Sequence, residues 1–135
     1  MEQDNVEQGM REIAGVRILE LKSSGPILKT SRDVSDLIGD AIGQQATLVL
    51  LPVSRLDSAF FDLRSGFAGE CLQKFVNYGL RLAIVGDISD RTAASSSLRD
   101  LIVEANRGTQ ISFVADQAAL VCRLNTVMLQ ANQQE

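Results

Sequence analysis

Two short polar segments, residues 62–66 and 86–87, hold the side chains best placed to do chemistry. Asp62, Arg64 and Ser65 stand directly before an apolar periodicity typical of a helix, where free backbone N–H groups and the helix dipole favour an anion. Arg64 adds a planar guanidinium that can hold a phosphate or carboxylate through two parallel hydrogen bonds. These residues predict a site for a small anionic ligand, or for a phosphate carried by Ser65.

Asp87 follows the apolar run 80–85, a position where a carboxylate often binds a ligand or takes part in catalysis. An aspartate is also common there because it stabilises the turn itself. In the same way, Asp62 or Ser65 could serve only as a helix cap. Both interpretations stay open. The candidate binding residues are Asp62, Arg64, Ser65, Gly66 and Asp87, and Ser65 is the candidate phosphorylation site.

The residue types exclude several kinds of site. The 135 residues include no histidine, which rules out a Ser-His-Asp site and a histidine-based zinc site. The two cysteines, Cys71 and Cys122, are too few for a thiolate cage; both fall on apolar helix faces and are expected as buried free thiols. The phosphate-binding fingerprints GxGxxG and GxxxxGK[ST] are absent. We therefore expect no metal, no cofactor and no assignable catalytic residue, and an enzymatic activity is left open.

Charge and hydropathy set the expected partners and location. The net charge is −4, and no cluster of Lys and Arg exceeds two neighbours, which disfavours nucleic acid or an anionic membrane. The longest apolar run, 46–53, is too short to cross a bilayer. The first ten residues lack the features of a signal peptide. We expect a cytoplasmic chain whose partner is a protein or a small anionic ligand, and a homodimer is left open.

The candidate residues need a scaffold, and the clearest element is a helix beginning near residue 67. Apolar side chains recur there on one helical face, and Gly79 can close the helix in a left-handed conformation. The residues on this face are Phe67, Ala68, Cys71, Leu72 and Phe75. Just before it stand Phe60 and Phe61, of which we expect one in the core and one partly exposed as an interaction anchor.

Strands and helices alternate along the rest of the chain. Residues 13–21 suit a half-buried strand, with 27–28 pairing back onto it as a hairpin. A helix capped by Thr30 or Ser31 follows, with Val34, Leu37, Ile38, Ala41 and Ile42 on its inner face. The later elements are buried strands at 47–51 and 80–85, a mobile polar loop at 88–97, a helix with Leu98, Leu101, Ile102 and Ala105 inward, a strand at 111–114 and a final helix capped by Asp116.

This order predicts one α/β domain over residues 11–135, after a disordered tail at 1–10. The sheet should have four or five mainly parallel strands and about four helices, with the strands at 47–51 and 80–85 adjacent and central. Ligands bind such sheets outside the carboxyl ends of the strands, where 62–66 and 86–87 are expected to lie.

Two stretches carry a resemblance to a known family. FFDLRSGFAGECLQKFVNYGLRLAIVGDIS and SLRDLIVEANRG resemble the signature of a small bacterial family known as domain of unknown function number 4180. The similarity extends from about Val16 to Val114. It implies a fold and no reaction, because the family has no assigned activity.

A more distant resemblance is to STAS domains, which share a hairpin followed by alternating helices and strands. Their regulatory serine precedes a glycine at the start of the helix after a central strand, where this chain has Ser65 and Gly66. STAS domains typically have Asp-Ser before that pair, whereas this chain has Leu63 and Arg64. The resemblance implies a STAS-like fold and makes Ser65 the matching position.

Two functions follow from these observations. The first is a non-catalytic regulatory module that binds a protein through the start of the central helix, with Phe60 or Phe61 exposed beside Ser65. The second is a domain that binds a small molecule or anion, or a metal-independent enzyme, with its site at the carboxyl edge of the sheet. An exposed phenylalanine would favour the first, and a cavity lined by Arg64 and Asp87 the second.

Overall fold

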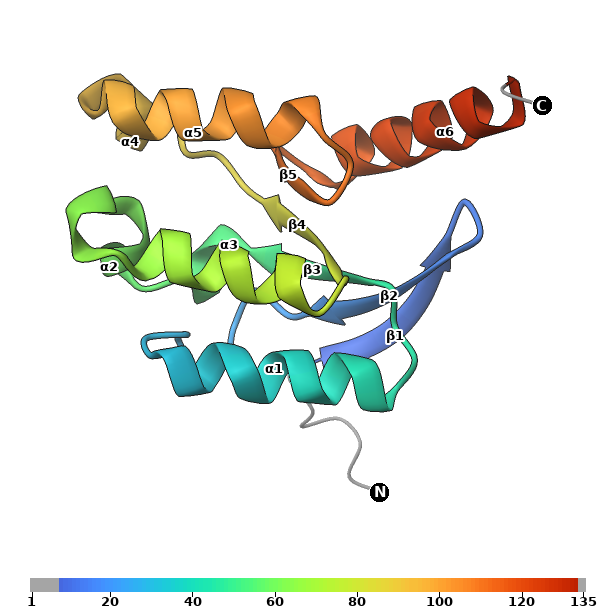
Figure 1. Cartoon of the computed structure of the whole chain (residues 1–135), viewed down its shortest axis with the longest axis horizontal. Helices are drawn as coiled ribbons and strands as arrows, with labels where there is room; N and C mark the ends of the chain where they lie inside the picture. Colours follow the sequence, from blue (N-terminus) through green and yellow to red (C-terminus); the bar gives the residue numbers. More distant parts are fainter. Residues whose placement is uncertain (1–7, 134–135) are drawn as a thin grey trace.

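One five-stranded sheet in the order β1-β2-β3-β4-β5 forms the centre of the structure (Figure 1). The computed structural model describes residues 8–133. The strands are β1 (Gln8–Ile13), β2 (Val16–Leu21), β3 (Leu48–Pro52), β4 (Arg81–Val85) and β5 (Ile111–Val114). β1 pairs antiparallel with β2, and the other three pairings are parallel. The predicted α/β domain with a mainly parallel sheet is confirmed.

Strands β3 and β4 lie side by side in the interior of the sheet, as their apolar sequences predict. Their register places Val49 opposite Leu82 and Leu51 opposite Ile84. All four of these side chains are buried. A strand covered on both faces can carry apolar residues at every position, which explains the uninterrupted runs in the sequence.

Six helices surround the sheet in the described part of the chain (Figure 1). They are α1 (Ser31–Gly43), α2 (Ser58–Phe61), α3 (Phe67–Asn77), α4 (Ser89–Ala94), α5 (Ser96–Arg107) and α6 (Gln117–Gln133), with 3₁₀ turns η2 (Val53–Arg55) and η3 (Leu63–Ser65). Helices α1, α3 and α5 share one hydrophobic core with the sheet, whereas Leu120 and Leu124 of α6 pack with residues of the other face. The crossovers that join the parallel strands therefore run along one face, and α6 covers the other.

The central helix α3 follows the sequence prediction closely. All five residues of its predicted inner face are buried: Phe67, Ala68, Cys71, Leu72 and Phe75. Gly79 has a φ of 67° just after the helix, the left-handed conformation expected of it. Helix α1 also begins as expected, because Thr30 and Asp33 form a reciprocal capping box.

The hairpin at the start of the sheet differs from the prediction. Ala14 and Gly15, with φ of 53° and 80°, form a two-residue turn between β1 and β2. The strand expected within 13–21 is β2, whereas Ile13 ends β1, which was not expected. Leu28 makes only an isolated parallel bridge with Leu56, and the predicted pairing of 27–28 with the first strand is wrong. Because β1 begins at Gln8, residues 8–10 of the expected tail belong to the sheet, and residues 1–7 lie outside the described residues.

Three further predictions are corrected. The polar stretch 88–97 contains helix α4 and the start of α5 instead of a continuous loop. The cap of α5 is Ser95, one of the three serines 95–97 expected to cap this helix. Ile42, which was expected on the inner face of α1, is exposed because its position lies outside that face. Cys122 is exposed on α6, while Cys71 is buried in α3 as expected. Burial raises the pKa of the Cys71 thiol to about 12, which makes this cysteine a poor nucleophile.

The open edge of β5 is covered by one side chain. The amide of Asn106, in the last turn of α5, donates to the Phe113 carbonyl at 3.1 Å. Its carbonyl oxygen accepts from the Phe113 backbone N–H at 2.8 Å. Asn106 thus pairs with both outward backbone groups of Phe113 and fixes α5 to the strand.

Candidate functional site

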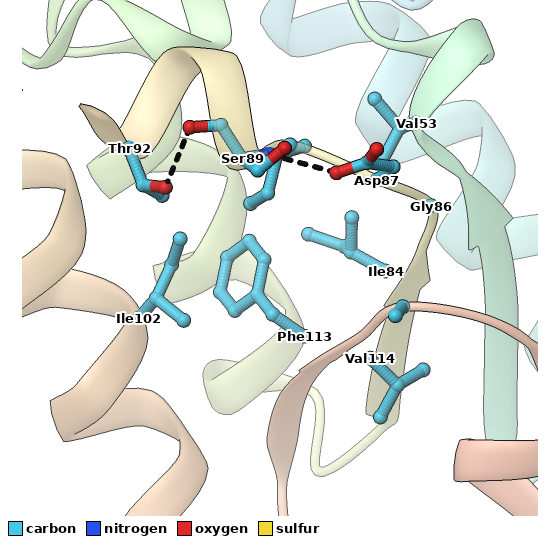
Figure 2. A pocket seen from close by; sticks show the side chains of 11 residues that line it. Val53, Ile84, Gly86, Asp87, Ser89, Thr92, Ile102, Phe113 and Val114 are labelled. Carbon is cyan, nitrogen blue, oxygen red and sulfur yellow. Dashed lines mark hydrogen bonds between the residues drawn. The ribbon is translucent and has the colours of Figure 1, made fainter. Parts of the chain in front are cut away.

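A pocket of about 240 Å³ lies at the carboxyl edge of β3, β4 and β5 (Figure 2). The chain leaves β4 through Gly86 and Asp87, leaves β5 through Ala115 and leaves β3 through Val53. Parallel strands bring all these exits to one edge, which is where α/β sheets bind ligands. The sequence predicted this location for Asp87.

The walls of the pocket are mainly apolar and come from three elements, two strands and a helix. Ile84 extends from β4, Phe113 from β5 and Ile102 from α5 (Figure 2). Gly86 allows the close approach of β4 to Val53, since a Cβ on Gly86 would lie 2.7 Å from Val53 Cγ2. The pocket therefore has a tightly packed base and walls suited to an apolar group.

Asp87 is the titratable side chain of the pocket lining. Its Oδ1 accepts a hydrogen bond of 2.9 Å from the Ser89 backbone N–H (Figure 2). That bond, together with one from the Ser89 side chain, lowers the pKa of Asp87 below the ordinary aspartate value of 3.8. Asp87 is exposed, so the pocket has an ionised carboxylate at its rim at neutral pH.

Helix α4 covers one side of the pocket. Ser89 and Thr92 line the pocket, and the Thr92 hydroxyl donates to the Ser89 carbonyl at 3.1 Å. None of the α4 residues is buried, so little apolar packing holds this helix. Arg91 supplies another contact: its guanidinium carbon lies 4.2 Å from the centre of the Phe61 ring.

The structure places Asp62 and Arg64 in a different hollow from Asp87. This second hollow, of about 440 Å³, is lined by Phe61, Asp62, Leu63, Arg64, Ala94, Ser95 and Ser97. The Arg64 side chain is 94% exposed, and its Nε lies 3.6 Å from Asp62 Oδ1. Helix α4 contributes to both hollows, Thr92 to the first and Ala94 to the second. The predicted site residues are thus divided between two hollows.

Ser65 lies just before the N-terminal end of α3, exposed, as predicted. Its hydroxyl donates to the Ala59 carbonyl at 2.6 Å and accepts from the Phe67 backbone N–H at 3.2 Å. Gly66 follows with a φ of 82°, a conformation that favours glycine. These contacts give Ser65 and Gly66 a structural role at the entry of the helix.

The expectation that Phe60 or Phe61 would be partly exposed is wrong. Phe60 is 0% exposed and Phe61 is 7% exposed. Phe60 makes edge-to-face contacts with both Phe61 and Phe67, at centroid distances of 5.2 and 6.3 Å. The two adjacent rings therefore belong to the core beneath the helix entry.

Sequence reasoning did not assign several residues to the site. In the sequence, Ile102 and Phe113 have the apolar pattern of ordinary core residues, and nothing in their spacing indicates a cavity. Thr92 lies in the segment whose sequence predicts a loop, and only the presence of α4 brings it to the pocket. Arg55, another polar residue after β3, is buried and donates from Nε to the Pro26 carbonyl at 2.6 Å, which stabilises that loop.

Comparisons with known proteins identify one family. The family model described as "Domain of unknown function (DUF4180)" matches residues 13–124. No curated protein and no solved structure matches the chain, so the STAS-like resemblance stays a prediction. Over the described residues, no group of His, Cys, Asp and Glu has an arrangement able to hold a metal ion. No helix in that part of the chain has the length and apolar character needed to cross a membrane.

Proposed function

The chain belongs to the DUF4180 family, whose description names no activity, and we therefore propose a function from the pocket: it binds a small organic molecule. The observation that carries this proposal is the hollow of about 240 Å³ between the carboxyl ends of β3–β5 and helix α4 (Figure 2). Ligand pockets combine apolar walls with a few placed polar groups, and here those groups are Asp87, Ser89 and Thr92. The volume lies just below the range of about 300–1,000 Å³ usual for ligand pockets, which suits a compact ligand.

The lining favours binding over catalysis. Asp87 is the one titratable side chain among the described residues that line the pocket. General acid–base catalysis usually needs a group whose pKa lies near the working pH, and the pKa of Asp87 is lowered away from it. A carboxylate that stays ionised is better suited to holding a ligand than to exchanging a proton.

The alternative, a module that binds a protein through the start of α3, has less support. It required an exposed aromatic anchor beside Ser65, and both Phe60 and Phe61 are buried. The Ser65 hydroxyl is already hydrogen-bonded to Ala59 and to Phe67. Phosphorylation of Ser65 stays a prediction, and the pocket beneath α4 is the stronger candidate for function.

The test uses three cyclohexyl compounds that differ only in the charge of the head group: cyclohexylammonium, cyclohexanol and cyclohexanecarboxylate. Binding of at least one should shift the backbone amide NMR signals of Gly86, Ile102 and Val114. Ala115→Trp places an indole at an exposed position of the lining and should remove these shifts without unfolding the chain. Val103→Trp, at an exposed position of α5 outside the lining, is the matched control. No saturable shift with any of the three compounds would refute the proposal.

A further inference from the structure

We propose that the pocket selects a small organic cation, in which an apolar body carries a protonated amine or a similar donor. This inference rests on the proposed function and adds the ligand class. Its basis is the arrangement of hydrogen-bond acceptors and charge at the rim of the pocket, where Asp87, Ser89 and Thr92 lie next to apolar walls (Figure 2).

Two hydrogen-bond donors at the rim are already used within the protein. The Ser89 N–H donates to Asp87 Oδ1, and the Thr92 hydroxyl donates to the Ser89 carbonyl. A hydrogen bond from the Ser89 side chain is a second cause of the lowered pKa of Asp87. The polar side chains therefore offer a ligand mainly acceptor positions: the remaining lone pairs of the Asp87 carboxylate and of the Thr92 oxygen. A ligand that donates hydrogen bonds complements this rim.

The charge of the lining also favours a cationic ligand. Its eleven residues include one aspartate and no lysine or arginine. Arg91 is on the same helix as Thr92, but its guanidinium lies over the Phe61 ring, and Phe61 belongs to the second hollow. An anionic head group would meet the Asp87 carboxylate without a compensating cation, whereas an ammonium would form a charge-assisted hydrogen bond with it.

The apolar walls of the pocket indicate what the rest of the ligand should be. Ile84, Ile102 and Phe113 surround the space beside the carboxylate with apolar surface (Figure 2). A small, fully hydrated cation gains nothing from such walls, whereas an alkyl or cycloalkyl body is removed from water by them. The inferred ligand thus has two parts, an apolar group of about six carbons within the pocket and a cationic head at its rim.

The experiment compares the affinities of cyclohexylammonium, cyclohexanol and cyclohexanecarboxylate by NMR titration at pH 7. Cyclohexylammonium should bind at least about tenfold more tightly than cyclohexanol, a difference of about 1.4 kcal/mol. Cyclohexanecarboxylate should bind most weakly. Asp87→Asn should remove the preference for the cation while cyclohexanol keeps its affinity. Asp90→Asn, in the first turn of α4 and outside the lining, should change none of the three affinities.

The outcomes separate this inference from the proposed function. Equal affinity for the cation and the alcohol, or a cation preference that persists in Asp87→Asn, overturns the inference and leaves a pocket that binds uncharged molecules. Tightest binding by the carboxylate also overturns it. Failure of all three compounds refutes the proposed function itself, provided that the unfolding midpoint shows a folded chain.

Discussion

The guanidinium of Arg91 and the ring of Phe61 are in contact, with the guanidinium carbon 4.2 Å from the ring centre. Thirty positions separate the two residues, and the contact joins helix α4 to helix α2. Since α4 has no buried residue, this cation–π pair is one of the contacts that hold it in place. The position of one wall of the pocket therefore depends in part on a residue that lies outside the pocket lining.

Loss of the Arg91 side chain should loosen α4. We expect Arg91→Ala to increase amide hydrogen exchange across 89–94 and to lower the free energy of unfolding by about 0.5–1 kcal/mol. Arg91→Lys should retain part of the protection, and Arg99→Ala, which removes an exposed arginine from α5, is the matched control. Unchanged exchange across α4 in Arg91→Ala would show that the cation–π contact does not hold the helix.

Truncation of Phe75 should be among the most destabilising substitutions in α3. Phe75 is fully buried in the main core, so Phe75→Ala should cost about 3–5 kcal/mol in urea unfolding. Its neighbour Val76 is 44% exposed, and Val76→Ala should cost less than about 1 kcal/mol. Similar losses in the two variants would mean that the buried face of α3 is wrongly assigned.

Gly86 should tolerate no side chain. It has a φ of 150°, and an added Cβ would lie 2.7 Å from Val53 Cγ2, so Gly86→Ala should destabilise the chain by about 1–3 kcal/mol. Gly39, within α1, has no atom within 4 Å of the added Cβ, and Gly39→Ala should instead stabilise by about 0.5–1 kcal/mol. Thermal unfolding that shows the same sign for both substitutions would contradict the close approach of β4 to Val53.

Ser65 should contribute to stability through its two hydrogen bonds. Ser65→Ala removes the donation to Ala59 and the acceptance from Phe67, and we expect a loss of about 1 kcal/mol in urea unfolding. Ser96→Ala, at an exposed position in the first turn of α5, is the control. A phosphate on Ser65 would also remove the donation to Ala59, so phosphorylation should have a measurable stability cost. No loss in Ser65→Ala would rule out the capping role.

Asp87 should titrate below the ordinary aspartate value of 3.8. Because its pKa is lower in the folded state, the stability it contributes is present above 3.8 and is lost as the pH falls through the lowered folded value. Carbon-detected NMR of the Asp87 carboxyl should show this midpoint. Ser89→Ala should raise the midpoint only in part, because the backbone hydrogen bond, the larger cause, remains. A midpoint at or above 3.8 in the unsubstituted chain would contradict the geometry.

The elements that the sequence predicts well are those whose apolar pattern depends on burial alone. The continuous runs of β3 and β4, and the buried repeat through Phe75 in α3, reflect contact with the core on one or both faces. Strand β1 has no comparable pattern: Gly9, Arg11 and Glu12 are exposed, and its place depends on pairing with β2. Helix α4 is missed for a related reason, since it has no buried face and Arg91 contacts Phe61 from an exposed position.

The same distinction applies to the candidate site. Asp87 could be predicted because a residue directly after a buried parallel strand must lie at the carboxyl edge. The sequence could not predict that Asp87 and Arg64 occupy separate hollows, because the division between the hollows depends on where α4 packs. The pocket itself could not be predicted either, because its lining residues Ile84, Ile102 and Phe113 are of the same types as those of a filled core.

The pairing of Asn106 with Phe113 bears on how copies of this chain could associate. An edge strand with free backbone groups is a template to which another chain can add a strand. Such pairing is the first step of edge-to-edge aggregation of sheets. Here the Asn106 amide already occupies both outward groups of Phe113, at the middle of the short strand β5. Strand addition at this edge would require the Asn106 side chain to release Phe113 first, so Asn106 acts as a barrier to polymerisation through β5.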